Sequence, residues 1–170
     1  MHRALPLILL LSLPRTTVEA QQASRQACTT GEYRQFDFWV GNWEVTDSAG
    51  TTIYGTNRVA SEEDRCLVHE NWAGSRGGTG QSLNFYDPQG QRWNQVWVGS
   101  DGLVLQITGH LDGTSMVLEG DGMSAGGKMV KQRASWTPQP DGRVRQYWQQ
   151  SADGGRTWTV AFDGWYRRKS

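Results

Sequence analysis

Short runs of alternating apolar and polar residues follow one another from Asn42 almost to the end of this 170-residue chain, separated by Gly, Asp and Pro turns. A period of two is typical of β-strands that bury one face. Ten strands are predicted, at 42–47, 51–60, 65–73, 81–87, 92–98, 103–109, 114–119, 128–137, 143–150 and 157–167. No helical pattern longer than two turns interrupts them. The fold is therefore predicted to be all-β, with antiparallel strands paired to their neighbours in sequence.

The number of strands favours a barrel. A sheet of about ten strands usually curls up or splits into two packed sheets, and closure into a barrel removes the exposed edges. The short connections favour up-and-down order. The sequence therefore predicts a single domain at 32–170, in which a short helical turn at 32–38 precedes an antiparallel up-and-down β-barrel.

The N-terminus has the pattern of a secretory signal peptide. A basic start at Met1-His2-Arg3 precedes an almost wholly apolar run at 4–14, and Val18-Glu19-Ala20 places small residues at a cleavage site. We expect residues 1–20 to be removed and residues 21–31 to form a flexible tail. No later stretch is long and apolar enough for a membrane span. The mature protein is expected to be periplasmic or secreted.

The two cysteines, Cys28 and Cys66, both follow the predicted signal peptide. In an oxidising compartment a single pair suggests one disulfide bond. That bond would tie the N-terminal tail to an early strand. The alternative is two free thiols.

The charge pattern gives no sign of a charged partner. The chain has 17 Lys and Arg against 17 Asp and Glu, without a long run of either sign, so we predict no nucleic-acid binding. Only His69 and His110 follow the signal peptide, and the cysteines lie far apart, so no metal site or cofactor is predicted. A lone histidine more often has a structural role than a heme-ligating one. The domain is expected to be monomeric.

Two short motifs resemble those of enzymes but lack their context. Residues 122–126 match the Gly-x-Ser-x-Gly nucleophile elbow, which needs a following helix and a later histidine. Here a strand follows, and the last histidine is His110. Residues 151–158 resemble the Asp-box turn of sialidases, which occurs there in several copies and here once. We expect it to form only the hairpin between the last two strands.

The aromatic stretch at 36–46 leads into the first strand through Gly41-Asn42-Trp43. This Gly-x-Trp resembles the entry motif of lipocalin-like barrels, in which the tryptophan plugs one end and a basic residue from the last strand covers its ring. The resemblance assigns structural roles to Gly41, Trp43 and Arg167, with Arg168 as the alternative basic residue.

The resemblance extends over 33–168 to a group of small secreted bacterial proteins of unknown function that are lipocalin-like. It is carried by five segments, at 36–45, 69–72, 84–88, 93–97 and 157–168. It implies a barrel fold and secretion, but it supplies no activity and no catalytic residues.

Strand alternation predicts which side chains enter the barrel. In the ninth strand Arg143, Arg145 and Tyr147 suit solvent, which turns Gln146 and Trp148 inward. Lys131 and Arg133 likewise suit solvent, which turns Gln132 inward from the eighth strand. In the fifth strand one face carries Trp93, Gln95 and Trp97 and the other carries Asn94, Val96 and Val98, and we expect the first face to point inward. Glu70 and Trp72 share one face of the third strand. The predicted ligand-binding set is Glu70, Trp72, Gln95, Trp97, Gln132, Gln146 and Trp148.

These residues would give an interior that is both aromatic and polar. Buried glutamines need hydrogen-bond partners, which a ligand, water or the other glutamines could provide. We therefore predict that the protein binds a small amphiphilic molecule in the barrel. Gln146→Leu is expected to weaken binding and to leave the melting temperature nearly unchanged.

Two other functions remain open. A carbohydrate-binding module would stack sugars on an exposed strip of tryptophans. A small secreted enzyme would use Glu70 together with a second titratable group in an open cavity. No catalytic residue is assigned, and the pattern favours a binding protein over an enzyme.

Overall fold

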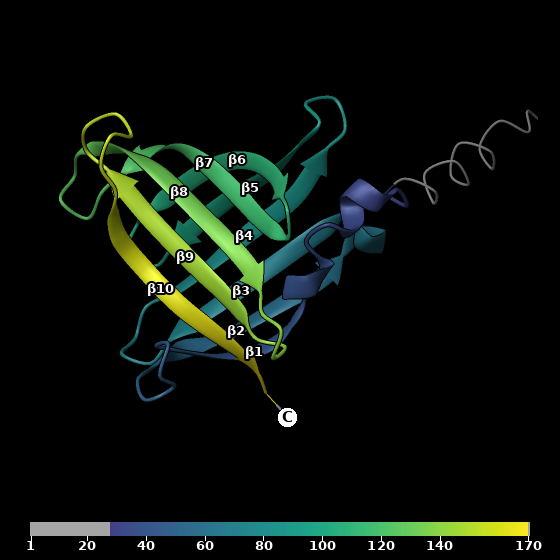
Figure 1. The fold of residues 1–170 in the computed structure, drawn as a ribbon, viewed down its shortest axis with the longest axis horizontal. Coiled ribbons are helices and arrows are strands. Elements are labelled where there is room, and N and C mark those ends of the chain that lie inside the picture. The colour runs from purple at the N-terminus through teal and green to yellow at the C-terminus, as the bar shows by residue number, and fades with distance from the viewer. Residues whose placement is uncertain (1–27, 170) are drawn as a thin grey trace, which may run out of the picture.

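The structure is a computed structural model that describes residues 28–169 (Figure 1). The predicted signal peptide and most of the predicted tail lie outside the described residues. Two 3-10 turns, η1 (Gly31–Arg34) and η2 (Asp37–Trp39), precede the strands, and η3 (Glu63–Arg65) lies between the second and third strands. The strands are β1 (Gly41–Thr46), β2 (Ile53–Glu62), β3 (Leu67–Gly74), β4 (Thr79–Asp87), β5 (Arg92–Gly99), β6 (Val104–Asp112), β7 (Ser115–Met123), β8 (Met129–Pro138), β9 (Val144–Ser151) and β10 (Thr159–Arg168).

The ten strands form a closed antiparallel barrel in which each strand pairs with its neighbours in sequence and β1 pairs with β10. The predicted fold class is thus confirmed. The largest difference from the predicted boundaries lies in β6 and β7, which pair as far as Asp112 and Ser115. Since only a tight turn separates them, His110 lies on a strand and not in a loop.

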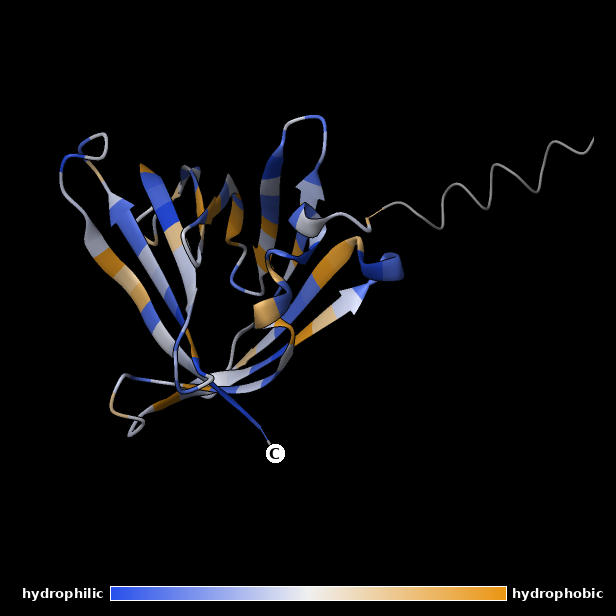
Figure 2. Cartoon of the chain, turned by 45° about the vertical axis from the view of Figure 1, so that its right-hand side comes forward, coloured by the Kyte–Doolittle hydropathy of each residue, from blue (hydrophilic) through white to orange (hydrophobic). Residues whose placement is uncertain are grey.

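The two ends of the barrel differ. The loops after β1, β3, β5, β7 and β9 lie at one end, which we call the open end. The other end carries η1, η2 and the remaining connections, and we call it the plugged end. In Figure 1 the loops β1–β2, β7–β8 and β9–β10 lie to the left, and η1 and η2 lie to the right. Strand alternation between hydrophobic and hydrophilic residues is visible in Figure 2.

Aromatic rings from η2 and its flanks close the plugged end. Phe36 and Trp39 are fully buried, and their rings stack with centroids 4.9 Å apart. Phe36 also meets the edges of Trp93 and Trp136, at 5.5 and 5.3 Å. Large rings bury much apolar area, and offset or edge-to-face pairs are favourable. The packing of this cluster explains why η2 and its flanks contain so many aromatic residues although they form no regular helix.

Trp43 is packed against this plug. Its indole Nε1 donates a hydrogen bond to the Trp39 carbonyl oxygen (2.8 Å), and only 1% of the residue is exposed. The Arg168 guanidinium lies 4.5 Å from the ring centroid, a cation–π distance. A Cβ at Gly41 would collide with that guanidinium. The glycine therefore leaves the space in which Arg168 covers the ring.

The basic residue over Trp43 is thus Arg168, and the structural role assigned to Arg167 was wrong. Arg168 is the cross-strand partner of Trp43, whereas successive strand residues point to opposite faces. Arg167 lies on the outer face, where its Nη2 bonds Glu44 Oε1 at 2.5 Å.

The predicted disulfide is present between Cys28 and Cys66. It joins the segment before η1 to the residue after η3, and both lie at the plugged end. Arg34 supports the same junction, since its guanidinium donates to the carbonyl oxygens of Cys28 and Arg65. The bond therefore fixes the plug to the barrel. No helix in the described part of the chain is long and apolar enough to cross a membrane.

Candidate functional site

A cavity of ≈ 300 Å³ lies inside the barrel. Its walls come from β3, β5, β6, β8, β9 and β10. The lining residues are Glu70, Trp72, Gln95, Trp97, Leu105, Ala134, Gln146, Trp148, Phe162 and Tyr166. This volume is at the lower end of the range for small-molecule sites. The barrel interior is therefore packed at the plugged end and contains a cavity beside that packing.

Five aromatic residues line the cavity, and three of them lie over wall glycines. A Cβ at Gly80 would overlap three ring atoms of Trp97, and a Cβ at Gly164 would overlap Phe162. A Cβ at Gly55 would come within 2.8 Å of the Trp72 ring. Because glycine has no side chain, each ring can lie against the wall and leave the centre of the barrel empty.

Polar side chains cover the deeper wall and form a connected network around Glu70. Asn57 Nδ2 donates to Glu70 Oε1 (2.7 Å), and Ser82 Oγ donates to Glu70 Oε2 (2.6 Å). Asn84 Nδ2 donates to Ser82 Oγ (2.9 Å), and Gln95 Nε2 donates to Asn84 Oδ1 (2.8 Å). All five residues are buried. The network therefore holds one carboxyl group rigidly inside the barrel.

Tyr166 extends the network across to β9. Its hydroxyl donates to Gln146 Oε1 and accepts a hydrogen bond from Asn57 Nδ2 (3.3 Å). Burial, together with the nearby Glu70 charge, raises the pKa of Tyr166 well above its usual value. The phenol is therefore neutral over the physiological range and acts as a fixed donor.

Burial also raises the pKa of Glu70, to about 7. The hydrogen bonds from Ser82 and Asn57 and the charge of His69 oppose this change but do not cancel it. Desolvation destabilises an ionised carboxylate. Among the described residues, none that lines the cavity carries a positive charge to offset this effect. Glu70 is consequently a carboxyl group that changes charge near neutral pH within a cavity.

Two amide groups have an atom without a protein partner at the cavity surface. Gln95 donates through Nε2, which leaves Oε1 unpaired, and Gln146 accepts through Oε1, which leaves Nε2 unpaired. Neither atom is among the fully buried unpaired atoms of the described residues. The cavity thus offers one acceptor and one donor in addition to Glu70.

Six of the seven predicted site residues line the cavity, and Gln132 does not. Its Oε1 accepts from Trp148 Nε1 (2.7 Å), and its Nε2 donates to the Met123 carbonyl oxygen (3.4 Å). Gln132 therefore orients the Trp148 ring without lining the cavity itself. The glutamines do not bond one another directly, since Gln95, Gln132 and Gln146 each bond to other residues.

Four residues that line the cavity are not in the predicted ligand-binding set: Leu105, Ala134, Phe162 and Tyr166. Alternation in β10, with buried Gly164 and Tyr166, could have shown that Tyr166 points inward. Phe162 was harder to predict, because a shift in register between Val160 and Phe162 interrupts that alternation.

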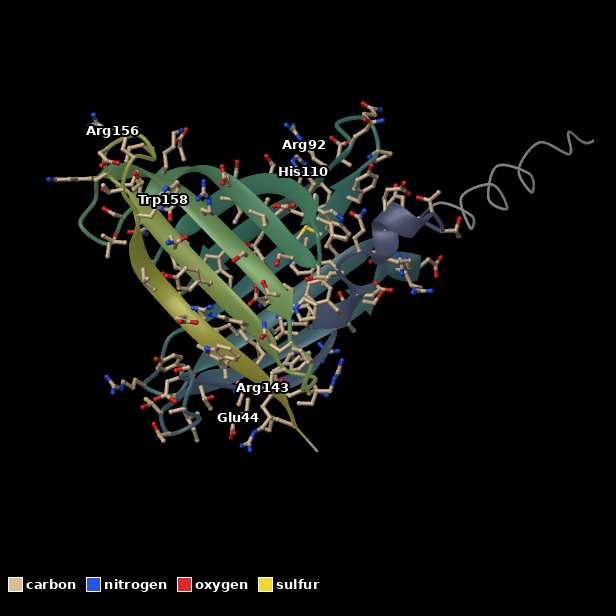
Figure 3. All side chains as sticks on the ribbon, viewed as in Figure 1. Glu44, Arg92, His110, Arg143, Arg156 and Trp158 are labelled. Carbon is tan, nitrogen blue, oxygen red and sulfur yellow. A yellow bond between two sulfur atoms is a disulfide. The ribbon has the colours of Figure 1, made fainter. Side chains whose placement is uncertain are left out.

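The histidines lie outside the cavity. His69 points away from Glu70, and its ring nitrogens bond Glu62 Oε2 and Gln81 Oε1, each at 3.0 Å. Figure 3 places His110 and Arg92 at the plugged end, opposite Arg156 and Trp158. Among the described residues, no three His, Cys, Asp or Glu side chains are grouped as a metal site.

The Asp-box resemblance corresponds to a hairpin turn at the open end. Asp153 accepts hydrogen bonds from the backbone of Arg156 and Thr157, both at 2.9 Å. These bonds and that from the Thr157 hydroxyl hold the pKa of Asp153 well below its usual value. All partners of this carboxylate belong to its own turn, so the motif has a structural explanation.

No protein-family model matches this chain, and a search of curated proteins found no match.

Proposed function

We propose that this protein binds a small amphiphilic organic molecule in the barrel cavity. The observation that carries the proposal is a cavity lined by five aromatic residues. Its polar wall contains the Glu70 carboxyl group and, in addition, two amide atoms that have no protein partner. Ligand sites in proteins usually combine apolar walls with a few placed polar groups. A barrel that needed only stability would fill this space with aliphatic side chains.

The wall glycines support this interpretation. Gly80 and Gly164 each sit behind a ring that would otherwise project into the barrel. A glycine within a strand weakens it, so these positions cost some stability and leave space for a guest. Trp72 and Phe162 also border a surface hollow between β2 and β10, through which a ligand could enter beside the open end.

Native mass spectrometry of the purified protein tests the proposal by searching for a co-purified small molecule. The matched comparison is Gly80→Ala, whose new methyl group would push the Trp97 ring into the cavity. Gly126→Ala is the control, since a Cβ there meets no atom closer than 3.8 Å. We expect a bound molecule in the wild type and in Gly126→Ala, and a reduced amount in Gly80→Ala. Equal occupancy of all three would contradict binding in this cavity.

Acid–base catalysis is a second candidate, because Glu70 and Tyr166 provide the two titratable groups that an enzyme would need. A carboxyl group with a pKa of about 7 can act as general base near neutral pH, and a neutral phenol can stabilise a developing oxyanion. Incubating the protein with the molecule that co-purifies and analysing it for conversion tests this role. Conversion that persists in Glu70→Gln would contradict it.

The carbohydrate alternative is not favoured by the positions of the tryptophans. Trp93 is buried, and its Nε1 donates to Gln35 Oε1 (3.1 Å). Trp72, Trp97 and Trp148 line the cavity. They therefore do not form the exposed strip on which a sugar chain would stack.

We further propose that the protein is a monomeric, lipocalin-like barrel that works outside the cytoplasm. The plugged end with Trp43 under Arg168 and the up-and-down order support the family proposal. The disulfide supports an oxidising compartment. Identifying the N-terminal residue of the protein recovered from the periplasm or medium tests cleavage after residue 20.

A further inference from the structure

The cavity contains a negative charge without a positive counterpart. Glu70 and Tyr166 are its only titratable lining residues, and no Lys, Arg or His is among the described residues that line it. The groups that bond Glu70 are neutral: Asn57 from β2 and Ser82 from β4, with Tyr166 of β10 linked through Asn57. His69, which precedes Glu70, lies on the outer face of β3. When Glu70 ionises, no cation lies beside it inside the barrel.

The aromatic rings present the complementary surface for a cation. Three adjacent ring atoms of Trp97 lie close to the position that a Cβ would take at Gly80, so the ring packs against the wall at this glycine. Trp97 also belongs to the cavity lining. The other aromatic residues of the lining are Trp72, Trp148, Phe162 and Tyr166. Ring faces attract cations, and tryptophan does so most strongly.

We propose that the ligand is an organic cation, an amine with an apolar body whose ammonium group bonds Glu70 while the rings surround it. This inference rests on the proposed function and specifies its ligand class. The unpaired Gln95 Oε1 provides a further acceptor on the same wall. An anionic ligand would meet Glu70 as a like charge, and a neutral one would leave the ionised carboxylate without a counterion.

The same geometry makes binding depend on pH. Glu70 must release its proton to form the ion pair, and its pKa of about 7 lies well below that of an alkyl amine. The cation should therefore bind more tightly as the pH rises through 7. Below that pH, Glu70 is protonated, and binding of the cation competes with that proton.

Isothermal titration calorimetry with three probes of similar shape tests the inference: 2-phenylethylamine, 2-phenylethanol and phenylacetate. At pH 8 we expect the amine to bind roughly 10- to 100-fold more tightly than the alcohol, since a hydrogen bond to a charged group is the additional interaction. Phenylacetate should bind most weakly. Between pH 5.5 and pH 8 the affinity for the amine should rise roughly tenfold or more, because Glu70 must ionise. This pH series needs no variant.

Glu70→Gln should abolish both the preference for the amine and its pH dependence. Glu119→Gln is the matched control, because Glu119 lies on the outer face and pairs with Arg133; it should keep both properties. Tighter binding of 2-phenylethanol or phenylacetate than of the amine would overturn the cation inference and leave the proposed function standing. The absence of binding by all three probes, together with no co-purified molecule, would overturn both.

Discussion

Glu70→Gln is predicted to change how the stability of the barrel depends on pH. The pKa of Glu70 rises from 4.5 to about 7 in the folded protein, mainly through burial. Between these values the folded state keeps a proton that the unfolded state has released. The free energy of unfolding must then fall as the pH rises through this interval, by about 1.4 kcal/mol per pH unit. The stabilising contribution is fully present below pH 4.5 and is lost above pH 7.

Over the interval between the two pKa values, the free energy of unfolding falls by a total of about 3 kcal/mol. A glutamine has a similar shape and no charge, so the variant should lack this loss. Any constant effect of altered hydrogen bonds with Ser82 or Asn57 cancels when the two proteins are compared across pH. Chemical denaturation of both proteins at pH 5, 6, 7 and 8 measures the difference, with the disulfide kept oxidised.

We expect the variant to gain stability relative to the wild type steadily from pH 5 to 7 and to keep that gain at pH 8. Glu119→Gln, which alters an exposed carboxylate, provides the control and should follow the wild type. A constant difference between Glu70→Gln and the wild type across this range would refute the argument, because it would show that Glu70 titrates alike in both states.

Three further predictions concern the plug, the disulfide and the cavity. Trp43→Ala should lower the free energy of unfolding, measured by chemical denaturation, by about 3–5 kcal/mol. Trp158→Ala at the open end should change it far less, and similar losses in the two variants would contradict the role of the plug. Reduction of the Cys28–Cys66 bond should lower stability by roughly 4 kcal/mol and preserve the far-UV circular dichroism of the barrel, and loss of that spectrum would show that the strands need the bond. Gln146→Leu should lower stability by about 1–3 kcal/mol, since the buried Tyr166 hydroxyl loses its acceptor; an unchanged melting temperature would support the expectation from sequence.

The fold could be predicted because local signals agree with one another. Most strands have period-two alternation, and turn residues mark nearly every boundary. The order of the strands follows from their short connections. The pairing beyond Gly109 was missed because glycine and histidine in β6 look like turn residues, although Leu111 pairs with Met116 across the hairpin.

The inward direction of Gln132, Gln146 and Trp148 could be predicted from the outward charges of neighbouring residues. Their partners could not, because hydrogen bonds across the barrel join residues far apart in sequence. The bond between Tyr166 and Gln146 depends on the register of β9 with β10. The choice between Arg167 and Arg168 also depended on register, which composition does not specify.

The central claim is that a small molecule binds inside the barrel, and the indole N–H signals of the tryptophans test it most directly. We suggest NMR titration of the ¹⁵N-labelled protein with 2-phenylethylamine and, separately, with 2-phenylethanol, with each indole assigned by a Trp→Phe variant. Shifts should appear for Trp72, Trp97 and Trp148, which line the cavity. Trp158 and Trp165, whose rings pack under arginines, should stay unchanged. Shifts confined to Trp158 and Trp165, or an unchanged spectrum with both probes, would contradict the claim.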